Sequence, residues 1–172
     1  MKTYTFLLLV LSLIFLGTLT TLAIEPIPIS QNYQYVAILS GDEAIPPQNT
    51  GAFGKAFFGL NQEMNQISYR VEVYNIYDVL MVTLRLGSPG KEGSLIVWLF
   101  PETPPPTPLK YKGLFEGVLA EGIITEDRLA GRLKGFPLST LIQEIENRRV
   151  FVQVDTLLHQ IGELRGQLLP NP

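Results

Sequence analysis

Short apolar segments recur along most of the chain, and glycine, proline and polar residues separate them. Between positions 66 and 73, apolar residues occupy every second position from Ile67, and polar residues such as Arg70 lie between them. Side chains of a strand point alternately to opposite faces, so this pattern predicts a half-buried strand. Alternating or continuous apolar runs predict further strands over residues 33–40, 51–60, 81–86, 95–100, 114–124, 128–133, 150–154 and 164–169.

One segment has a helical pattern. After Pro137, apolar residues between positions 138 and 145 recur at helical spacing. Ser139 or Thr140 could cap the first turn, and Arg148 and Arg149 would suit the negative end of the helix dipole. Many short strands with one helix predict an all-β fold, an antiparallel β-sandwich or barrel with one short α-helix before the penultimate strand.

The N-terminal segment differs from the rest. Lys2 precedes an apolar run at 6–16, and a cleavage pattern with small residues ends at Ala23. Together these features form the pattern of a secretory signal peptide. We therefore expect a signal peptide at 1–23, a linker at 24–32 and a domain at 33–170. The product would be secreted or held at the cell surface. The alternative is an uncleaved anchor, the one case in which we expect membrane contact.

The composition of the chain excludes some classes of function and favours one kind of source. The formal net charge is −3, and no basic run extends beyond Arg148 and Arg149, which argues against nucleic-acid binding. The chain has no cysteine, so an exported form cannot use disulfides, and this favours a bacterial origin. The proline-rich segment 101–108 predicts an exposed spacer loop, with docking to a proline-binding partner as the alternative.

The C-terminal sequence from Gly162 to Leu168, GELRGQL, resembles the end of the CHRD (chordin-type) domain family. Three further segments, at 39–47, 82–93 and 138–156, resemble the family in the same order. The resemblance spans about residues 35–168 and implies a β domain. It implies no particular ligand, because the family is defined more by its fold than by an activity.

The resemblance also draws attention to three positions. The family commonly has two histidines separated by one residue on one strand and a third on another, a set that suits zinc or copper. This chain has Thr83, Arg85 and Asp155 at those positions. We therefore expect no cofactor, and a degenerate site whose residues face away from the core. An Arg85–Asp155 ion pair could replace the metal; the alternative is two unrelated surface charges.

Three other side chains are candidates for contacts with a ligand. Tyr74 and Tyr77 fall in the predicted connection 74–78, and His159, the one histidine, falls in a predicted loop. Glu43 and Glu163 suit turn capping or cross-strand pairing better than acid–base chemistry.

The sequence thus predicts an exported, non-catalytic binding or structural module, not an enzyme, whose partner is an unknown protein or cell-surface ligand. The alternative is a copper- or zinc-binding protein or a metalloenzyme similar to superoxide dismutase.

Overall fold

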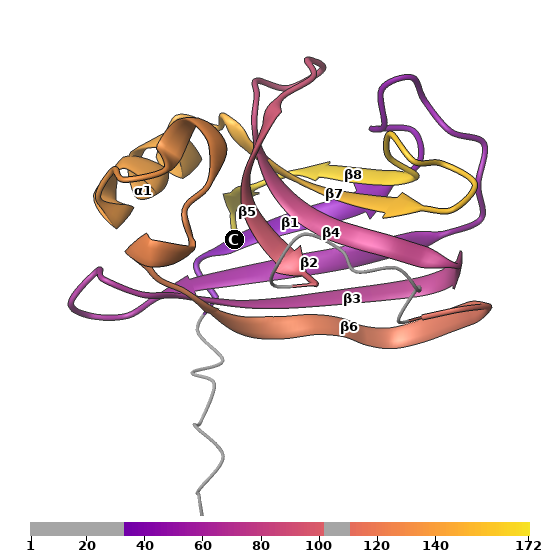
Figure 1. Ribbon diagram of the computed structural model, residues 1–172, viewed down its shortest axis with the longest axis horizontal. Helices are drawn as coiled ribbons and strands as arrows, with labels where there is room; N and C mark the ends of the chain where they lie inside the picture. Colours follow the sequence, from indigo (N-terminus) through magenta and orange to yellow (C-terminus); the bar gives the residue numbers. More distant parts are fainter. Residues whose placement is uncertain (1–32, 102–110) are drawn as a thin grey trace, which may run out of the picture.

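A computed structural model describes residues 33–101 and 111–172 (Figure 1). The predicted signal peptide at 1–23, the linker at 24–32 and most of the proline-rich segment lie outside the described residues. Within the described ranges, no helix is long and apolar enough to cross a membrane.

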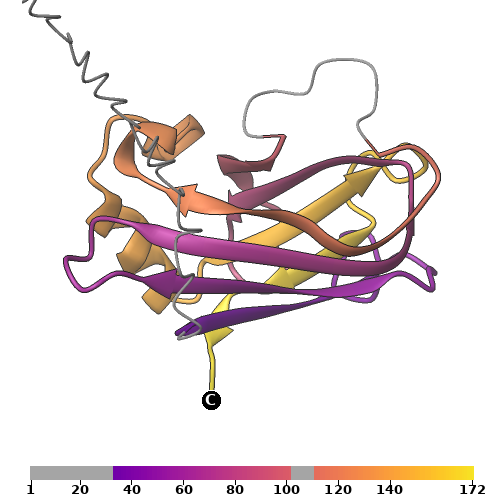
Figure 2. The ribbon, with the colours of Figure 1, turned by 90° about the horizontal axis from the view of Figure 1, so that it is seen from below.

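The strands form one antiparallel sheet that curls into a nearly closed, barrel-like shape (Figures 1 and 2). Its order is β5-β4-β7-β8-β1-β2-β3-β6, and β9 pairs with β1. The strands are β1 (Tyr35–Ser40), β2 (Phe53–Leu60), β3 (Ile67–Tyr77), β4 (Val79–Leu86), β5 (Ser94–Phe100), β6 (Leu114–Ile124), β7 (Val150–Thr156), β8 (Leu164–Gln167) and β9 (Leu169–Pro170). The predicted antiparallel all-β fold is confirmed, with its helix before the last strands.

The alternation of the sequence has the predicted consequence. In β3, residues Ile67, Tyr69, Val71 and Val73 are buried, and the residues between them are partly exposed. The inward-facing residues of the other strands join them in one hydrophobic core. Burying a side chain of this size contributes about 1.5–3 kcal/mol, so the two-residue period is sufficient to decide which face points inward.

The helix α1 (Leu138–Glu146) covers one end of the sheet. Its buried face consists of Leu138, Leu141, Ile142 and Ile145. The predicted side-chain cap is wrong, because the helix starts one residue earlier than Ser139 and has Pro137 as N-cap, with no side-chain hydrogen bond. At the other terminus, Arg149 forms an ion pair with Glu144 at 2.6 Å.

The segment 128–133, predicted as a strand, instead forms parts of two 3₁₀ helices, η1 (Glu126–Arg128) and η2 (Gly131–Leu133). Leu129 and Leu133 are the buried residues of this segment, but Gly131 between them is exposed, which breaks the two-residue period of a strand. The backbone amide of Ala130 donates to the carbonyl of Ile96 in β5. The segment therefore packs against the edge of the sheet without joining it as a strand.

The strand β3 is longer than predicted. It continues past position 73 through a bulge to Tyr77, and only Asp78 separates it from β4. Tyr74 and Tyr77 therefore belong to the end of a strand and not to a connecting loop. A positive φ of 52° at Asn75 and 49° at Asp78 accompanies the bulge and the tight turn.

Candidate binding site

Thr83, Arg85 and Asp155 lie on one face of two neighbouring strands, β4 and β7, opposite the core residues Val82 and Leu84. Only Arg85 is partly exposed, whereas Thr83 and Asp155 are 0% and 2% exposed. These residues face away from the core, as predicted, but the solvent exposure expected of a surface pair is wrong for Thr83 and Asp155.

The loop between β4 and β5 forms hydrogen bonds with two arginines of this face. The loop between β4 and β5 rises above β4 in Figure 1. Its Gly93 carbonyl accepts a hydrogen bond of 2.9 Å from Arg85 Nε, and its Ser88 carbonyl accepts one of 3.3 Å from Arg165 Nη2. The local pattern of β4 and β7 contains no signal for these contacts, because the accepting carbonyls lie outside both strands.

The predicted Arg85–Asp155 ion pair does not form. Asp155 pairs across the sheet with Met81, whereas Arg85 pairs with Phe151, so the two charged residues lie well apart along their strands. The Asp155 carboxylate instead accepts a hydrogen bond of 2.6 Å from Gln153 Nε2. Burial raises the pKa of Asp155 to about 6, against the opposing effects of the Gln153 hydrogen bond and the positive charge of Arg85.

This face does not have the chemistry of a zinc or copper site. Thr83 supplies a neutral hydroxyl, Arg85 is a cation, and the Asp155 carboxylate is hydrogen-bonded to Gln153. Within residues 33–101 and 111–172, no three His, Cys, Asp or Glu side chains are grouped so that they could hold a metal ion. The residues present therefore do not fit the metal that the family's histidines would suit.

The motif from Gly162 to Leu168 has structural roles throughout. Gly162 has a φ of +116°, which favours glycine. The Arg165 guanidinium lies 3.7 Å from the centre of the Phe151 ring. A Cβ atom at Gly166 would collide with the carbonyl oxygen of Ile38. Gln167 Nε2 donates to the backbone carbonyls of the segment that starts β7. The motif therefore holds β8 between its neighbours.

Glu163 connects this motif by hydrogen bonds to the β1–β2 loop and to the end of β7. Its carboxylate is 7% exposed and accepts hydrogen bonds of 2.6 Å from the hydroxyls of Thr50 and Thr156. Both oxygens are thus occupied, which explains how the protein tolerates the buried charge. Spacing along the chain could not have revealed the Thr50 contact, which joins residues 113 positions apart.

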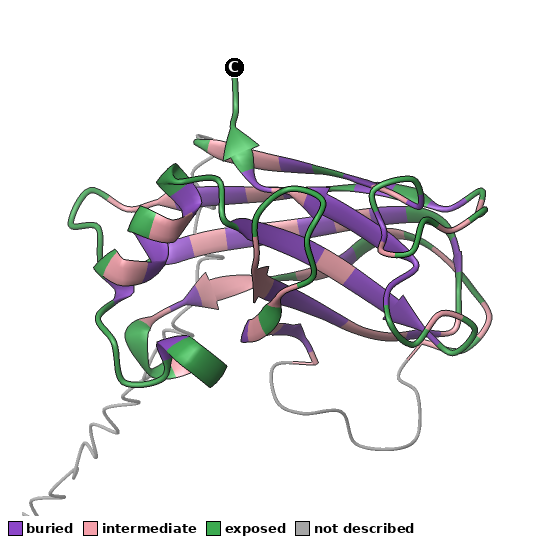
Figure 3. Ribbon diagram, turned by 90° about the horizontal axis from the view of Figure 1, so that it is seen from above, coloured by how far each residue is buried: buried purple, intermediate pink, exposed green. Residues whose placement is uncertain are grey.

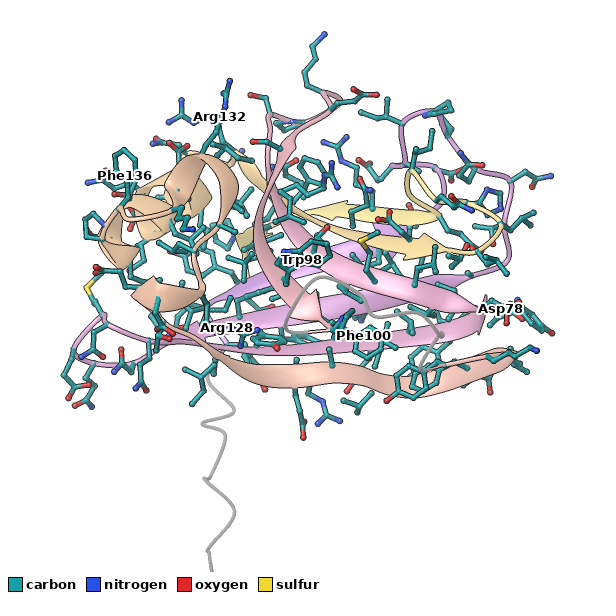
Figure 4. The ribbon with its side chains drawn as sticks, viewed as in Figure 1. Asp78, Trp98, Phe100, Arg128, Arg132 and Phe136 are labelled. Carbon is teal, nitrogen blue, oxygen red and sulfur yellow. The ribbon has the colours of Figure 1, made fainter. Side chains whose placement is uncertain are left out.

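A pocket opens at the end of the sheet opposite α1, where Asp78 is labelled in Figure 4. Three segments form it: the β1–β2 loop, the β3–β4 turn and the β7–β8 loop. Its volume is about 590 Å³, within the range of ligand sites. The lining residues are Asn49, Thr50, Gly51, Asn75, Tyr77, Asp78, Leu157, Leu158, His159 and Glu163.

Two of the three predicted contact residues, Tyr77 and His159, meet in this pocket although they are distant in sequence. The third, Tyr74, lies beside it and stacks on Phe53 with ring centres 5.4 Å apart. Tyr77 is 55% exposed, and the segments at this end are largely exposed in Figure 3. The three predicted residues therefore gather at one end of the molecule.

Two hydrogen bonds donated by backbone amides hold Asp78 in the pocket's wall. The Asp78 carboxylate accepts a hydrogen bond of 2.7 Å from the Gly113 amide, and the Asp78 carbonyl accepts one of 3.0 Å from the Leu157 amide. In contrast, the side chains of Asn49, Asn75 and His159 make no hydrogen bond to the described residues. The site combines a fixed frame with uncommitted polar groups, an arrangement suited to binding.

A second cavity, of about 830 Å³, lies at the other end beside α1. It contains none of the candidate site or contact residues predicted from the sequence, and its wall includes the exposed residues Glu126, Asp127 and Lys134.

Fold and site together define a class: a nearly closed antiparallel β domain with a loop-built pocket at one end. The family model for the CHRD domain matches residues 35–168, so the chain belongs to the CHRD domain family and the predicted resemblance is confirmed. No curated protein and no solved structure matches the chain.

Proposed function

We propose that this CHRD-domain protein is an exported, non-catalytic binding module and that the pocket between the β1–β2, β3–β4 and β7–β8 segments is its binding site. The single observation that carries the proposal is the convergence of Tyr77 and His159, from distant segments, on one pocket of about 590 Å³. Loops carried by a rigid sheet are where binding residues concentrate.

The character of the lining supports binding over catalysis. A catalytic base needs a nucleophile to activate and a further group that orients it. The His159 imidazole makes no hydrogen bond to the described residues, so none of them fills either role. The one carboxylate deep in the site, that of Glu163, is held by two threonine hydroxyls. Export rests on the sequence pattern at 1–23.

The test compares capture of a partner by variants at the two ends of the molecule. The chain, tagged at its C-terminus, is cross-linked on its source cells as wild type, Tyr77→Ala, Leu158→Ala and Phe136→Ala. Phe136 is a matched control, because it is 51% exposed but lies at the α1 end (Figure 4). We expect one partner with the wild type and with Phe136→Ala, and its loss from both pocket variants. Equal capture by all four proteins would refute the site.

Export has its own test. Mass spectrometry of the tagged protein from the extracellular and cell-surface fractions should find a mature N-terminus at Ile24. A chain that keeps residues 1–23 and remains with the membrane would instead support the anchor.

A further inference from the structure

We infer that the pocket accepts a basic side chain, arginine or lysine, presented by a polypeptide partner between apolar residues. The inference rests on the proposed function, since it names the kind of partner that the same pocket would bind. Three features of the pocket support the inference together: the negative charge of its lining, an exposed aromatic ring and an apolar rim.

The first observation is the charge of the lining. Two lining residues are acidic, Asp78 and Glu163, and none is lysine or arginine. The carboxylate of Asp78 accepts one hydrogen bond, from the Gly113 amide, through Oδ1. A carboxylate has room for about four hydrogen bonds, so donors from a ligand can still be accepted. The lining would repel a phosphate or a carboxylate and attract a cation.

The second observation is the exposed ring of Tyr77, which lines the same cavity as these carboxylates. A cation over an aromatic face gains a further attraction that a neutral ligand lacks. The chain already contains one contact of this kind, between Arg165 and Phe151. A guanidinium can also donate several hydrogen bonds in one plane, to the uncommitted amides of Asn49 and Asn75 as well as to the acids.

The third observation is the apolar rim. Leu157 and Leu158 line the pocket and are 51% and 83% exposed, and Ile161 in the same loop is 67% exposed. The stacked and exposed pair Phe53 and Tyr74 adds two apolar rings on the paired strands β2 and β3. Exposed apolar side chains gathered around a polar centre are typical of protein-binding surfaces. They favour a peptide with apolar residues beside its basic one over a free amine or a sugar.

The test titrates the isotope-labelled chain with four small probes and follows its backbone amides by NMR. The probes are the capped tripeptides Leu-Arg-Leu, Leu-citrulline-Leu and Leu-Glu-Leu, and methyl glucoside. Citrulline keeps the shape of arginine without its charge. We expect the arginine peptide to shift the amides of Asn75, Tyr77 and Leu158, the citrulline peptide to bind at least about fivefold more weakly, and the other two probes to leave these amides unmoved.

Charge-removing variants locate the effect. Asp78→Asn and Glu163→Gln each keep an acceptor oxygen, and each should weaken the arginine peptide by about three- to tenfold. Glu126→Gln, at the α1 end, should leave its affinity unchanged. If Glu163→Gln fails to fold, Asp78→Asn alone decides.

Three outcomes would overturn the inference: equal binding of the arginine and citrulline peptides, binding of methyl glucoside in place of the peptides, or no shift with any probe. None of them depends on the cellular partner. A partner captured through Tyr77 and Leu158 would therefore leave the proposed function standing even where the basic side chain is refuted.

Discussion

The guanidinium of Arg128 joins the two free edges of the sheet: its Nη2 donates a hydrogen bond of 2.8 Å to the carbonyl oxygen of Trp98 in β5 (Figure 4). Its Nη1 donates one of 2.7 Å to the carbonyl of Ile123 in β6. Nearby, the Tyr69 hydroxyl donates to the Leu99 carbonyl at 3.0 Å. Side chains thus close the gap where backbone pairing stops. This cover matters because unpaired strand edges invite pairing with other chains.

Arg128→Ala should therefore destabilise the protein by about 2–4 kcal/mol, since two hydrogen bonds from a charged donor are lost at once. The free energy of unfolding from urea denaturation measures the effect. Arg132→Ala, a change at an exposed arginine in η2, should alter stability by no more than about 0.5 kcal/mol. Equal stability of both variants would contradict the role of Arg128 in closing the sheet.

Asp155→Asn should stabilise the protein at pH 8 and have little effect at pH 4. Burial raises the pKa of Asp155 from its ordinary value of 3.8 to about 6, so the folded state disfavours the ionised form. The resulting cost is absent below the unfolded pKa, grows as the pH rises from about 4 to about 6, and is complete above that. At 1.36 kcal/mol per pKa unit it reaches about 3 kcal/mol.

Thermal and urea unfolding at pH 4, 6 and 8 check this prediction. Asparagine keeps an oxygen that can accept the Gln153 hydrogen bond, so the charge is the main difference. Asp42→Asn, at an exposed position, serves as the control and should not change the pH dependence. A stability gain that is the same at pH 4 and pH 8 would show that Asp155 titrates normally in the folded protein.

Much of the fold follows from local pattern. The strand β6 has the predicted bounds, and β3 has the predicted alternation of buried and partly exposed residues. Such elements are predictable because the apolar residues of a strand lie on the face that packs against the core. The prediction fails at 128–133, where Arg128 and Ala130 bond to β5 through contacts distant in sequence. A pattern of apolar residues identifies which side chains are buried, but not which backbone groups find partners elsewhere.

The candidate site shows the same division. Exposure of Tyr74 and Tyr77 was predicted, although from a connecting loop that is in fact the end of β3. That Tyr77 lines one pocket with His159 depends on how β3 and β7 are placed in the sheet. The burial of Asp155 was not predictable, since the alternation of β7 places this residue only on the face away from the core. Loop placement, unlike strand period, leaves no repeat in the sequence.

Purified protein should retain no stoichiometric zinc or copper. The positions that would carry the family's histidines hold a hydroxyl, a cation and a hydrogen-bonded carboxylate, which do not make a site for either metal. Metal analysis after expression with each metal and exhaustive dialysis provides the measurement. One equivalent of metal that disappears in Asp155→Ala or His159→Ala would establish the metalloprotein alternative instead.

Gly166→Ala should destabilise the protein by about 1–3 kcal/mol, because a Cβ there would overlap the carbonyl oxygen of Ile38, a backbone atom that cannot rotate away. The matched control is Gly90→Ala. Gly90 has a φ of +69° and open space around it, so alanine there is strained but collides with nothing. We expect a cost of about 1 kcal/mol for that strain alone. Urea denaturation of both variants separates collision from strain. If Gly166→Ala is no less stable than Gly90→Ala, β8 does not approach β1 this closely. Close packing against β1 would then not be the reason for a glycine at position 166.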